Sequence, residues 1–166
     1  FSGINGGSIR IYINKGLREI DESVNITLEN ENQSGMNSFD FIKDYFNEIK
    51  NHADKVNEFV KKIKKEGGKV SIYGASTRGN TNLLLSRLEK NMIEFAYEKN
   101  PDKINRFCPG SDILIKDEKE LLDDQPDYLI VMPYSFIDEF LVKEEKYLQR
   151  GGKMVTLVPA VRVYTK

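Results

Sequence analysis

The sequence predicts an α/β domain built on a mostly parallel sheet. Three observations indicate this class: short apolar runs alternate with helical patterns from residue 69 onward, a glycine turn follows the first of these runs, and a long amphipathic helix precedes them. Alternation of this kind is typical of right-handed βαβ crossovers, whose helices cover both faces of one sheet. We therefore expect a Rossmann-like three-layer domain, preceded by a long helix and a leftover N-terminal strand.

Size and composition indicate a soluble globular protein. The chain has 166 residues, of which 39% are hydrophobic and 31% charged, which suits one domain with a real core. Its net charge of −1 argues against a nucleic-acid binder that neutralises many phosphates. No apolar run approaches the ~20 residues that span a bilayer.

The single cysteine, Cys108, excludes an internal disulfide framework and indicates a reducing, cytoplasmic setting. With His52 as the one histidine, we expect no metal site in this chain. Cys108 is interpreted as a small loop residue, because no histidine lies near it in the predicted fold to activate it. His52 is interpreted as a solvated residue at the flank of the long helix.

The N-terminal third contains three different patterns. Residues 8–13 alternate polar and apolar side chains, which predicts a half-buried strand. The polar, acidic stretch that follows is interpreted as a linker that contains a short helix around residues 24–30. From Ser38, an N-cap candidate, apolar residues recur at helical spacing as far as Ile63, and Gly67-Gly68 ends the pattern. This helix would be about 40 Å long at ~1.5 Å per residue.

The remaining elements alternate in type. Strands are expected over residues 69–73, 93–97, 127–132 and 153–158, with helices near 79–90, 117–123 and 136–149. In sheets of this kind ligands bind beyond the carboxyl ends of the strands, near the topological switch point. Three strand ends, 74–80, 98–100 and 133–136, are therefore expected to converge on one crevice.

The turn after the first of these strands is the strongest candidate site. A strand-to-helix turn exposes unpaired backbone N–H groups at the positive end of a helix, which suits phosphate. Hydroxyl and amide side chains add neutral donors, and one guanidinium can fork onto phosphate oxygens. The predicted binding residues of the turn are Gly74, Ser76, Thr77, Arg78, Gly79 and Asn80.

The same turn departs from the dinucleotide fingerprint G-x-G-x-x-G. Gly74, Ser76 and Gly79 occupy the three glycine positions, so the middle glycine is absent. That position normally lets a pyrophosphate lie against bare backbone. The substitution weakens the case for NAD and leaves the phosphate cradle intact.

Four further residues at neighbouring strand ends are candidates for substrate binding. Glu98 lies near the position where Rossmann domains place an acid against ribose hydroxyls, and the alternative interpretation is a solvated strand end. Asn100 follows it. Arg106, in the next loop, offers a second anion contact. Tyr134 is expected to stack on a base or to close the crevice, and the alternative is that this segment is only an ordinary helix start.

Taken together, these motifs have a familiar order. They are Asn5-Gly6-Gly7-Ser8-Ile9-Arg10, Tyr73 to Asn80, Asn100-Pro101-Asp102-Lys103, Pro109-Gly110, Pro126-Asp127-Tyr128, Pro133-Tyr134-Ser135-Phe136 and Arg150-Gly151-Gly152-Lys153. Over essentially its whole length the chain resembles the C-terminal domain of the S-adenosylmethionine-dependent sugar C-methyltransferases, which add methyl branches to nucleotide-linked deoxysugars. The resemblance implies a transferase of deoxysugar biosynthesis.

That resemblance implies two further domains, a zinc-binding N-terminal domain and a middle methyltransferase domain that binds S-adenosylmethionine. We expect neither domain within these 166 residues, in agreement with a chain that starts at Phe1. Residues 1–14 would then be the terminal strand of the preceding methyltransferase domain, 15–37 a linker and 38–166 the Rossmann-like C-terminal domain. The missing domains of the same chain become the expected partners, and a homodimer is a further one.

The implied reaction begins when a base removes a proton next to the sugar ketone, and the enolate then attacks the methyl of the donor. The base and donor site would lie in the missing part, so this fragment carries no catalytic residue and no cofactor and is inactive alone. It would hold the nucleotide diphosphate of the sugar. Two positions depart from the family: Arg78 stands where lysine is common, and Ser135 where many relatives have histidine.

Two other classes of function remain open at this stage. The chain can be read as a dinucleotide (NAD-type) binding module of an oxidoreductase, against which the absent middle glycine counts. It can also be read as a purely structural or dimerisation domain. The nucleotide, the sugar and the methylated carbon are not specified by the sequence.

Overall fold

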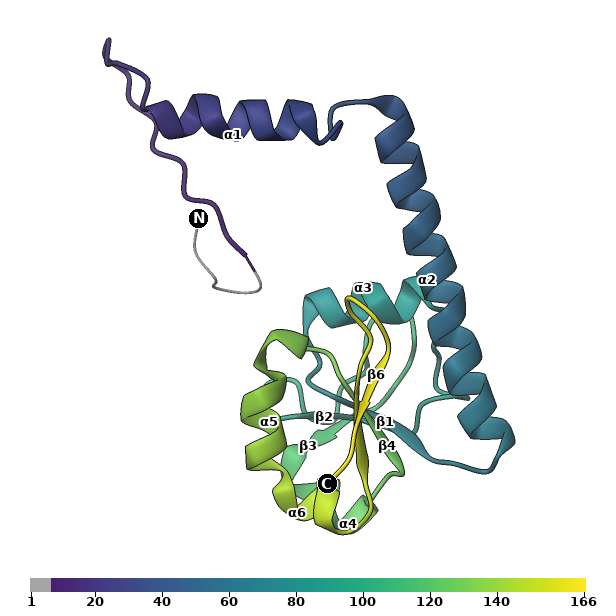
Figure 1. Ribbon diagram of the computed structural model, residues 1–166. Helices are drawn as coiled ribbons and strands as arrows, with labels where there is room; N and C mark the ends of the chain where they lie inside the picture. Colours follow the sequence, from purple (N-terminus) through teal and green to yellow (C-terminus); the bar gives the residue numbers. More distant parts are fainter. Residues whose placement is uncertain (1–6) are drawn as a thin grey trace. The chain divides into compact units, whose positions relative to one another are not determined.

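The computed structural model of the chain describes residues 7–166 (Figure 1). It has two compact units, residues 1–49 and 50–166, with the helix α2 running through the boundary. The first unit contains helix α1 (Glu22–Gln33) and the start of α2 (Phe39–Lys65). The second unit contains the rest of α2 and all of the sheet.

The two N-terminal helices begin at side-chain caps. Asp21 accepts a hydrogen bond from Ser23 N at 2.9 Å at the start of α1, and Ser38 Oγ accepts one from Phe41 N at 3.1 Å at the start of α2. The expected cap at Ser38 is confirmed. So is the helix around 24–30, which extends over 12 residues.

The strand predicted over residues 8–13 is wrong. Ser8 forms an isolated bridge, whereas residues 9–13 have no strand structure and are exposed. Alternating side chains make a strand only when a neighbouring strand supplies backbone partners, and no strand of the described part pairs with residues 9–13. The assignment of residues 1–14 to a preceding domain stays a prediction, and residues 1–6 lie outside the described residues.

One six-stranded sheet forms the centre of the second unit, in the order β3-β2-β1-β4-β5-β6. The strands are β1 (Val70–Tyr73), β2 (Ala96–Glu98), β3 (Ile115–Asp117), β4 (Tyr128–Val131), β5 (Lys153–Thr156) and β6 (Arg162–Tyr164). The first five are parallel, and β6 is antiparallel to β5. Because β1 pairs with both β2 and β4, the topological switch point lies between β1 and β4.

The helices of this unit are shorter than the sequence patterns predict. They are α3 (Thr77–Leu85), α4 (Leu121–Asp124), α5 (Ile137–Lys143) and α6 (Glu145–Gln149), with single 3₁₀ turns over Glu118–Glu120 and Tyr134–Phe136. The single helix predicted near 136–149 is thus two helices with a break at Glu144, whose φ of −101° and ψ of 29° are not helical.

Helices cover both faces of the sheet, which confirms the predicted three-layer α/β fold (Figure 1). On one face, Val60 of α2 and Leu83 of α3 pack with Ile72 and Ile130. The opposite face packs against α4, α5 and α6. Its core residues are Tyr73, Tyr97, Leu121, Leu129, Val131, Tyr147, Leu148 and Met154.

A buried amide joins the two helices of the first face. Asn57 of α2 is 4% exposed, and its Nδ2 donates to Ser86 O, at the end of α3, at 2.7 Å. That carbonyl would otherwise be one of the unpaired groups of a helix C-terminus. The contact fixes the position of α3, and with it the turn that precedes α3.

Candidate functional site

The turn between β1 and α3 has the strand-to-helix geometry that the sequence predicts. Gly74 has φ of +89° and donates from N to Tyr97 O at 2.8 Å. A Cβ atom at Gly74 would lie 2.9 Å from Pro133 Cδ. Glycine is therefore required here twice, for its left-handed backbone and for the close approach of the turn after β4.

Ser76, at the middle glycine position, is the N-cap of α3. Its Oγ accepts a hydrogen bond from Gly79 N at 3.0 Å, which satisfies one of the unpaired donors of the helix start. Its hydroxyl hydrogen remains available to a ligand. The absent glycine is thus replaced by a side chain that helps to build the turn.

Three consecutive backbone N–H groups remain free at this turn. Within the described part of the chain, the amides of Ser76, Thr77 and Arg78 donate no hydrogen bond. They lie at the N-terminus of α3, where the helix dipole adds partial positive charge. The exposed Arg78 side chain stands in the same first turn. The arrangement is suited to an anion with several oxygens.

A cavity of about 280 Å³ opens beside this turn. Its wall is formed by the turn and the start of α3, by the loop 103–109, and by side chains from the ends of β1, β3 and β4, including Ile72, Ile115 and Met132. Its interior is mainly apolar, whereas the turn and Lys103 supply polar groups. This combination is typical of small-molecule sites.

The cavity gathers most of the predicted binding residues but not all. It is lined by Gly74, Ser76, Thr77, Gly79, Asn80 and Arg106. Arg78, Glu98, Asn100 and Tyr134 do not line it. Tyr134 is partly buried in the 3₁₀ turn after β4, next to the Gly74 turn in the sheet order.

Asn80 connects the helix to the loop that closes the cavity. Its Nδ2 donates to Pro109 O at 3.0 Å. One of the two N–H donors of the Asn80 side-chain amide is therefore used within the protein. Through this hydrogen bond Asn80 holds the loop against α3 and so shapes the cavity.

Glu98 is held by several protein donors. Its carboxylate accepts from Ala75 N at 3.2 Å, Lys99 N at 3.0 Å, Asn100 N at 3.2 Å and Lys103 Nζ at 3.1 Å. Burial raises the pKa of this carboxyl, but the hydrogen bonds from Asn100 N, Lys103 and Lys99 N outweigh burial and lower the pKa overall. The ribose role predicted for Glu98 would compete with these contacts.

Lys103 is the charged residue that our sequence analysis did not select. Its Nζ donates to Ala75 O at 2.9 Å as well as to Glu98, and it lines the cavity. The signal in the sequence was a cation in the loop after β2, between Glu98 and Arg106. Sequence alone does not show that this loop folds back onto the β1 turn.

The cysteine and the histidine both depart from simple solvent exposure. Cys108 lines the cavity and is 4% exposed. Burial raises the pKa of its thiol, which keeps it protonated and unsuited to nucleophilic chemistry. His52 is partly buried, and its Nε2 forms no hydrogen bond with any residue of the described part of the chain. The interpretation of His52 as solvated is wrong, because it flanks the buried Ala53 on α2.

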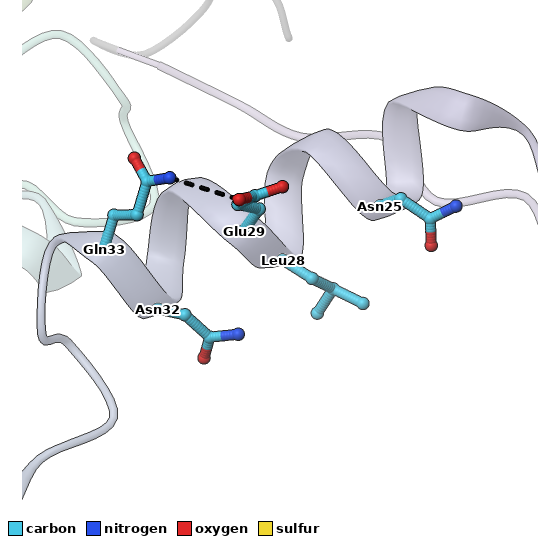
Figure 2. Close-up of a pocket in the computed structure, with 5 residues that line it drawn as sticks. All are labelled: Asn25, Leu28, Glu29, Asn32 and Gln33. Atoms are coloured by element: carbon cyan, nitrogen blue, oxygen red, sulfur yellow. Dashed lines mark hydrogen bonds between the residues drawn. The ribbon is translucent and has the colours of Figure 1, made fainter.

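A second hollow, of about 530 Å³, lies along α1 (Figure 2). All of its lining residues, Asn25, Leu28, Glu29, Asn32 and Gln33, belong to that one helix. Gln33 Nε2 donates to Glu29 Oε1 at 3.2 Å, the spacing of neighbours on a helix face. A hollow with one wall does not enclose a ligand, so we do not regard it as a site.

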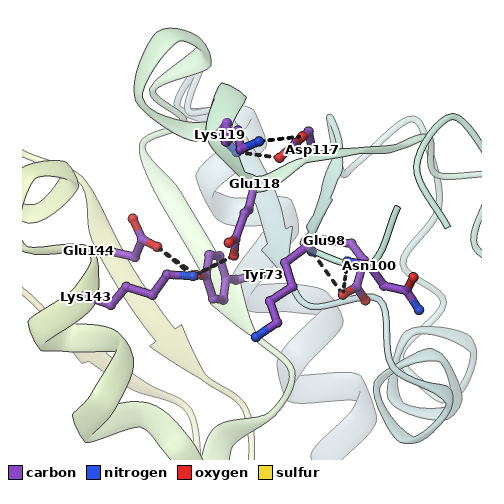
Figure 3. Close-up of polar contacts among 9 residues, drawn as sticks. Tyr73, Glu98, Asn100, Asp117, Glu118, Lys119, Lys143 and Glu144 are labelled. Carbon is purple, nitrogen blue, oxygen red and sulfur yellow. Dashed lines mark hydrogen bonds and ion pairs between the residues drawn. The ribbon is translucent and has the colours of Figure 1, made fainter. Parts of the chain in front are cut away.

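A polar cluster lies on the face of the sheet that α5 covers (Figure 3). The hydroxyl of Tyr73 donates to Glu144 Oε1 at 2.7 Å and accepts from Lys143 Nζ at 2.7 Å. Lys143 also pairs with Glu118 at 2.6 Å. Burial raises the pKa of Tyr73, and the two carboxylates raise it further. These groups satisfy one another and join the α5–α6 break to β1.

The described residues contain neither a cluster of metal ligands nor a helix that could span a membrane. Residues 7–166 contain no group of three or more histidine, cysteine, aspartate or glutamate side chains placed to hold a metal ion. Within the same residues no helix combines the length and apolar character needed to cross a membrane.

Comparison with known families identifies the class of this domain. The C-methyltransferase C-terminal domain family matches residues 3–159, and the chain belongs to this family. Among characterised proteins it is similar to the C-methyltransferase NovU of Streptomyces niveus, with 24% identity over 162 residues. The match covers 96% of this chain and 39% of NovU, so the chain spans well under half of that relative.

Proposed function

We propose that this chain is the nucleotide-sugar-binding part of a C-methyltransferase that transfers a methyl group from S-adenosylmethionine to a carbon of a keto-deoxysugar nucleotide. The observation that carries the proposal is the row of free N–H groups at Ser76, Thr77 and Arg78. Membership of the C-methyltransferase family supplies the class of reaction.

In this proposal the diphosphate lies against the β1–α3 turn. Its oxygens accept the three backbone N–H bonds, and the Arg78 guanidinium adds a charge-assisted pair. Arg106, which lines the cavity from the loop after β2, contributes a second cation. The apolar interior takes one ring of the ligand, and Tyr134 flanks another on the β4 side of the turn.

The chain's own task is then to bind and orient. S-adenosylmethionine supplies the methyl group and, like zinc, binds in domains outside this chain. A base outside the chain removes the proton next to the sugar ketone, and the resulting carbanion must lie in line with the methyl group. Holding the diphosphate rigidly fixes the sugar for that attack, a contribution made through orientation. The proposal includes a cytoplasmic location and association with the missing domains.

Titration calorimetry on the full chain tests this proposal. The probes are uridine, thymidine, guanosine and adenosine diphosphates and their glucose conjugates. We expect at least one to bind, and we expect Arg78→Ala to weaken that binding by roughly 1–3 kcal/mol, the scale of a charge-assisted contact. Arg162→Ala, which removes an exposed arginine of β6, is the matched control and should bind as the parent does. Equal affinity of Arg78→Ala and parent would reject the phosphate assignment.

Thermal melting with other ligands separates the alternative functions. A ligand that binds only the folded state raises the melting temperature by mass action. Stabilisation by NAD and not by nucleoside diphosphates would favour an oxidoreductase module. Stabilisation by none of these compounds would favour a structural or dimerisation domain. We expect stabilisation by a nucleoside diphosphate.

A further inference from the structure

The loop after β2 is connected to the β1–α3 turn by one salt bridge with several attached hydrogen bonds. Glu98 Oε2 accepts from both Ala75 N, at 3.2 Å, and Lys103 Nζ, at 3.1 Å. Lys103 Nζ in turn donates to Ala75 O at 2.9 Å. Both polar groups of the Ala75 backbone are thus bound by this pair, one by the carboxylate and one by the ammonium.

Ala75 immediately precedes the row of free N–H groups at residues 76–78. An ammonium bound to the Ala75 carbonyl therefore lies at the edge of the anion cradle, on the side that faces the cavity. A lysine has three N–H donors, and the described contacts use two of them. The Lys103 side chain keeps 41% of its surface exposed, and its third donor has no acceptor within the described residues.

Glu98 is less exposed than Lys103 and has less hydrogen-bonding capacity left for a ligand. Its side chain is 14% exposed, and its second oxygen accepts from Lys99 N and Asn100 N. Nearly all of its hydrogen-bonding capacity is thus spent inside the protein. A carboxylate whose oxygens are already bound within the protein affects a ligand indirectly, by positioning the groups that donate to it, here Ala75 N and Lys103 Nζ.

We propose that Lys103 is a diphosphate-binding residue of the β1–α3 turn and that Glu98 is the residue that positions it. This inference rests on the proposed function and assigns a role that differs from direct ribose binding by Glu98. Three cations then lie near the free N–H groups of residues 76–78: Arg78 from α3, and Lys103 and Arg106 from the loop after β2. Glu98 holds the Lys103 ammonium beside these backbone donors.

The sequence offers a matched control. Lys99 precedes Lys103 by four residues in the same loop, is exposed, and makes no side-chain contact within the described residues. Lys99→Met and Lys103→Met remove the same charge from nearly the same place. Only the second removes an ammonium bound to the turn.

The experiment measures Kd by calorimetry for the tightest-binding of the four nucleoside diphosphates named above and for inorganic pyrophosphate, at several sodium chloride concentrations. We expect Lys103→Met to weaken binding about tenfold or more, as for loss of one charged hydrogen bond. Lys103→Arg should stay within about threefold of the parent, and Lys99→Met within about twofold. Salt screens contacts between charges, so the increase of Kd with sodium chloride concentration should be smaller in Lys103→Met than in the parent, a change that a structural role would not produce.

A positioning role for Glu98 predicts a dependence on Lys103. Glu98→Gln keeps an oxygen acceptor for Ala75 N and removes the charge that holds Lys103. It should therefore weaken binding in the parent and add little in a Lys103→Met background. If Lys103→Met proves unstable in melting experiments, Lys103→Gln removes the charge while keeping a donor for Ala75 O.

The outcomes distinguish the two proposals. If the parent binds and Arg78→Ala weakens it while Lys103→Met binds as tightly as the parent, the role of Lys103 is overturned and the proposed function stands. If none of the diphosphates binds the parent, both are overturned. An additive loss in the double variant would overturn the positioning role of Glu98 alone.

Discussion

Gly79 of α3 lies against Met132, the residue after β4: a Cβ atom at Gly79 would be 2.7 Å from Met132 Cβ and 3.0 Å from Ser76 Oγ. The helix therefore packs on the strand end through a bare backbone. This close approach brings the N-terminus of α3, with its free N–H groups, to the switch point between β1 and β4.

Gly79→Ala should separate α3 from β4. The added methyl must push Met132 or the helix aside, an overpacking that typically costs about 1–3 kcal/mol. We expect this loss in the free energy of unfolding measured by urea denaturation. Gly16→Ala is the control, since a Cβ there meets only Asn14 Nδ2 at 3.5 Å, and it should change stability little. Equal stability of the two variants would contradict the close packing.

Tyr73→Phe should destabilise the fold through the polar cluster of Figure 3. The Tyr73 ring is 4% exposed and its hydroxyl contacts Glu144 and Lys143. Removing the hydroxyl leaves the partly buried Glu144 carboxylate and Lys143 ammonium each with one hydrogen-bond partner fewer. We expect the free energy of unfolding to fall by about 1–3 kcal/mol. Urea denaturation measures the effect. Tyr12→Phe, at a side chain that is 84% exposed, should be neutral, and a neutral Tyr73→Phe would show that the cluster does not stabilise the fold.

The sequence predicts the β1–α3 turn well because its determinants are local. A strand, a glycine with positive φ, a serine cap and a helical pattern follow one another within about a dozen residues, and each depends on its neighbours alone. The helix cap at Ser38 was predictable for the same reason. The neighbouring positions of the β1, β2 and β4 ends follow from the general order of such sheets.

Other features depend on partners distant in the sequence. Strand β3 (Ile115–Asp117) is preceded by the short apolar run Ile113-Leu114-Ile115, which is too short to separate a strand from a loop, so its pairing with β2 was not predicted. The strand predicted over 8–13 has the right alternation, but no strand of the described residues pairs with residues 9–13. The break at Glu144 coincides with its contact to Tyr73, and the role of Lys103 depends on a loop that folds onto Ala75. No local pattern encodes these contacts.

Cys108 provides a direct probe of the cavity. It is the only cysteine, it lines the cavity, and burial raises the pKa of its thiol. We expect its reaction with a disulfide reagent such as Ellman's reagent to be much slower than that of the urea-unfolded chain, with a pH profile displaced above that of free cysteine. A bound nucleoside diphosphate should slow it further. A native rate equal to the unfolded rate would contradict the burial of Cys108.

The lowered pKa of Glu98 makes part of the stability depend on pH. A carboxyl whose pKa is lower in the folded than in the unfolded state binds protons less tightly when folded. Its contribution is therefore complete above the unfolded value, roughly pH 4.3, and is lost as pH falls through the folded value. Burial opposes this shift, and the hydrogen bonds from Asn100 N, Lys103 and Lys99 N produce it.

Glu98→Gln should thus be less stable than the parent at pH 7, and the difference in free energy of unfolding should shrink as pH falls below about 4. Urea denaturation at intervals between pH 3 and 7 measures this difference directly. Glu89→Gln, at an exposed glutamate without an ion pair in the described part of the chain, is the control and should be about as stable as the parent at pH 7. Protonation of Glu98 at low pH removes the same charge that Glu98→Gln removes at every pH. A difference in free energy of unfolding that stays constant across this range would therefore mean that the carboxylate charge does not stabilise the turn.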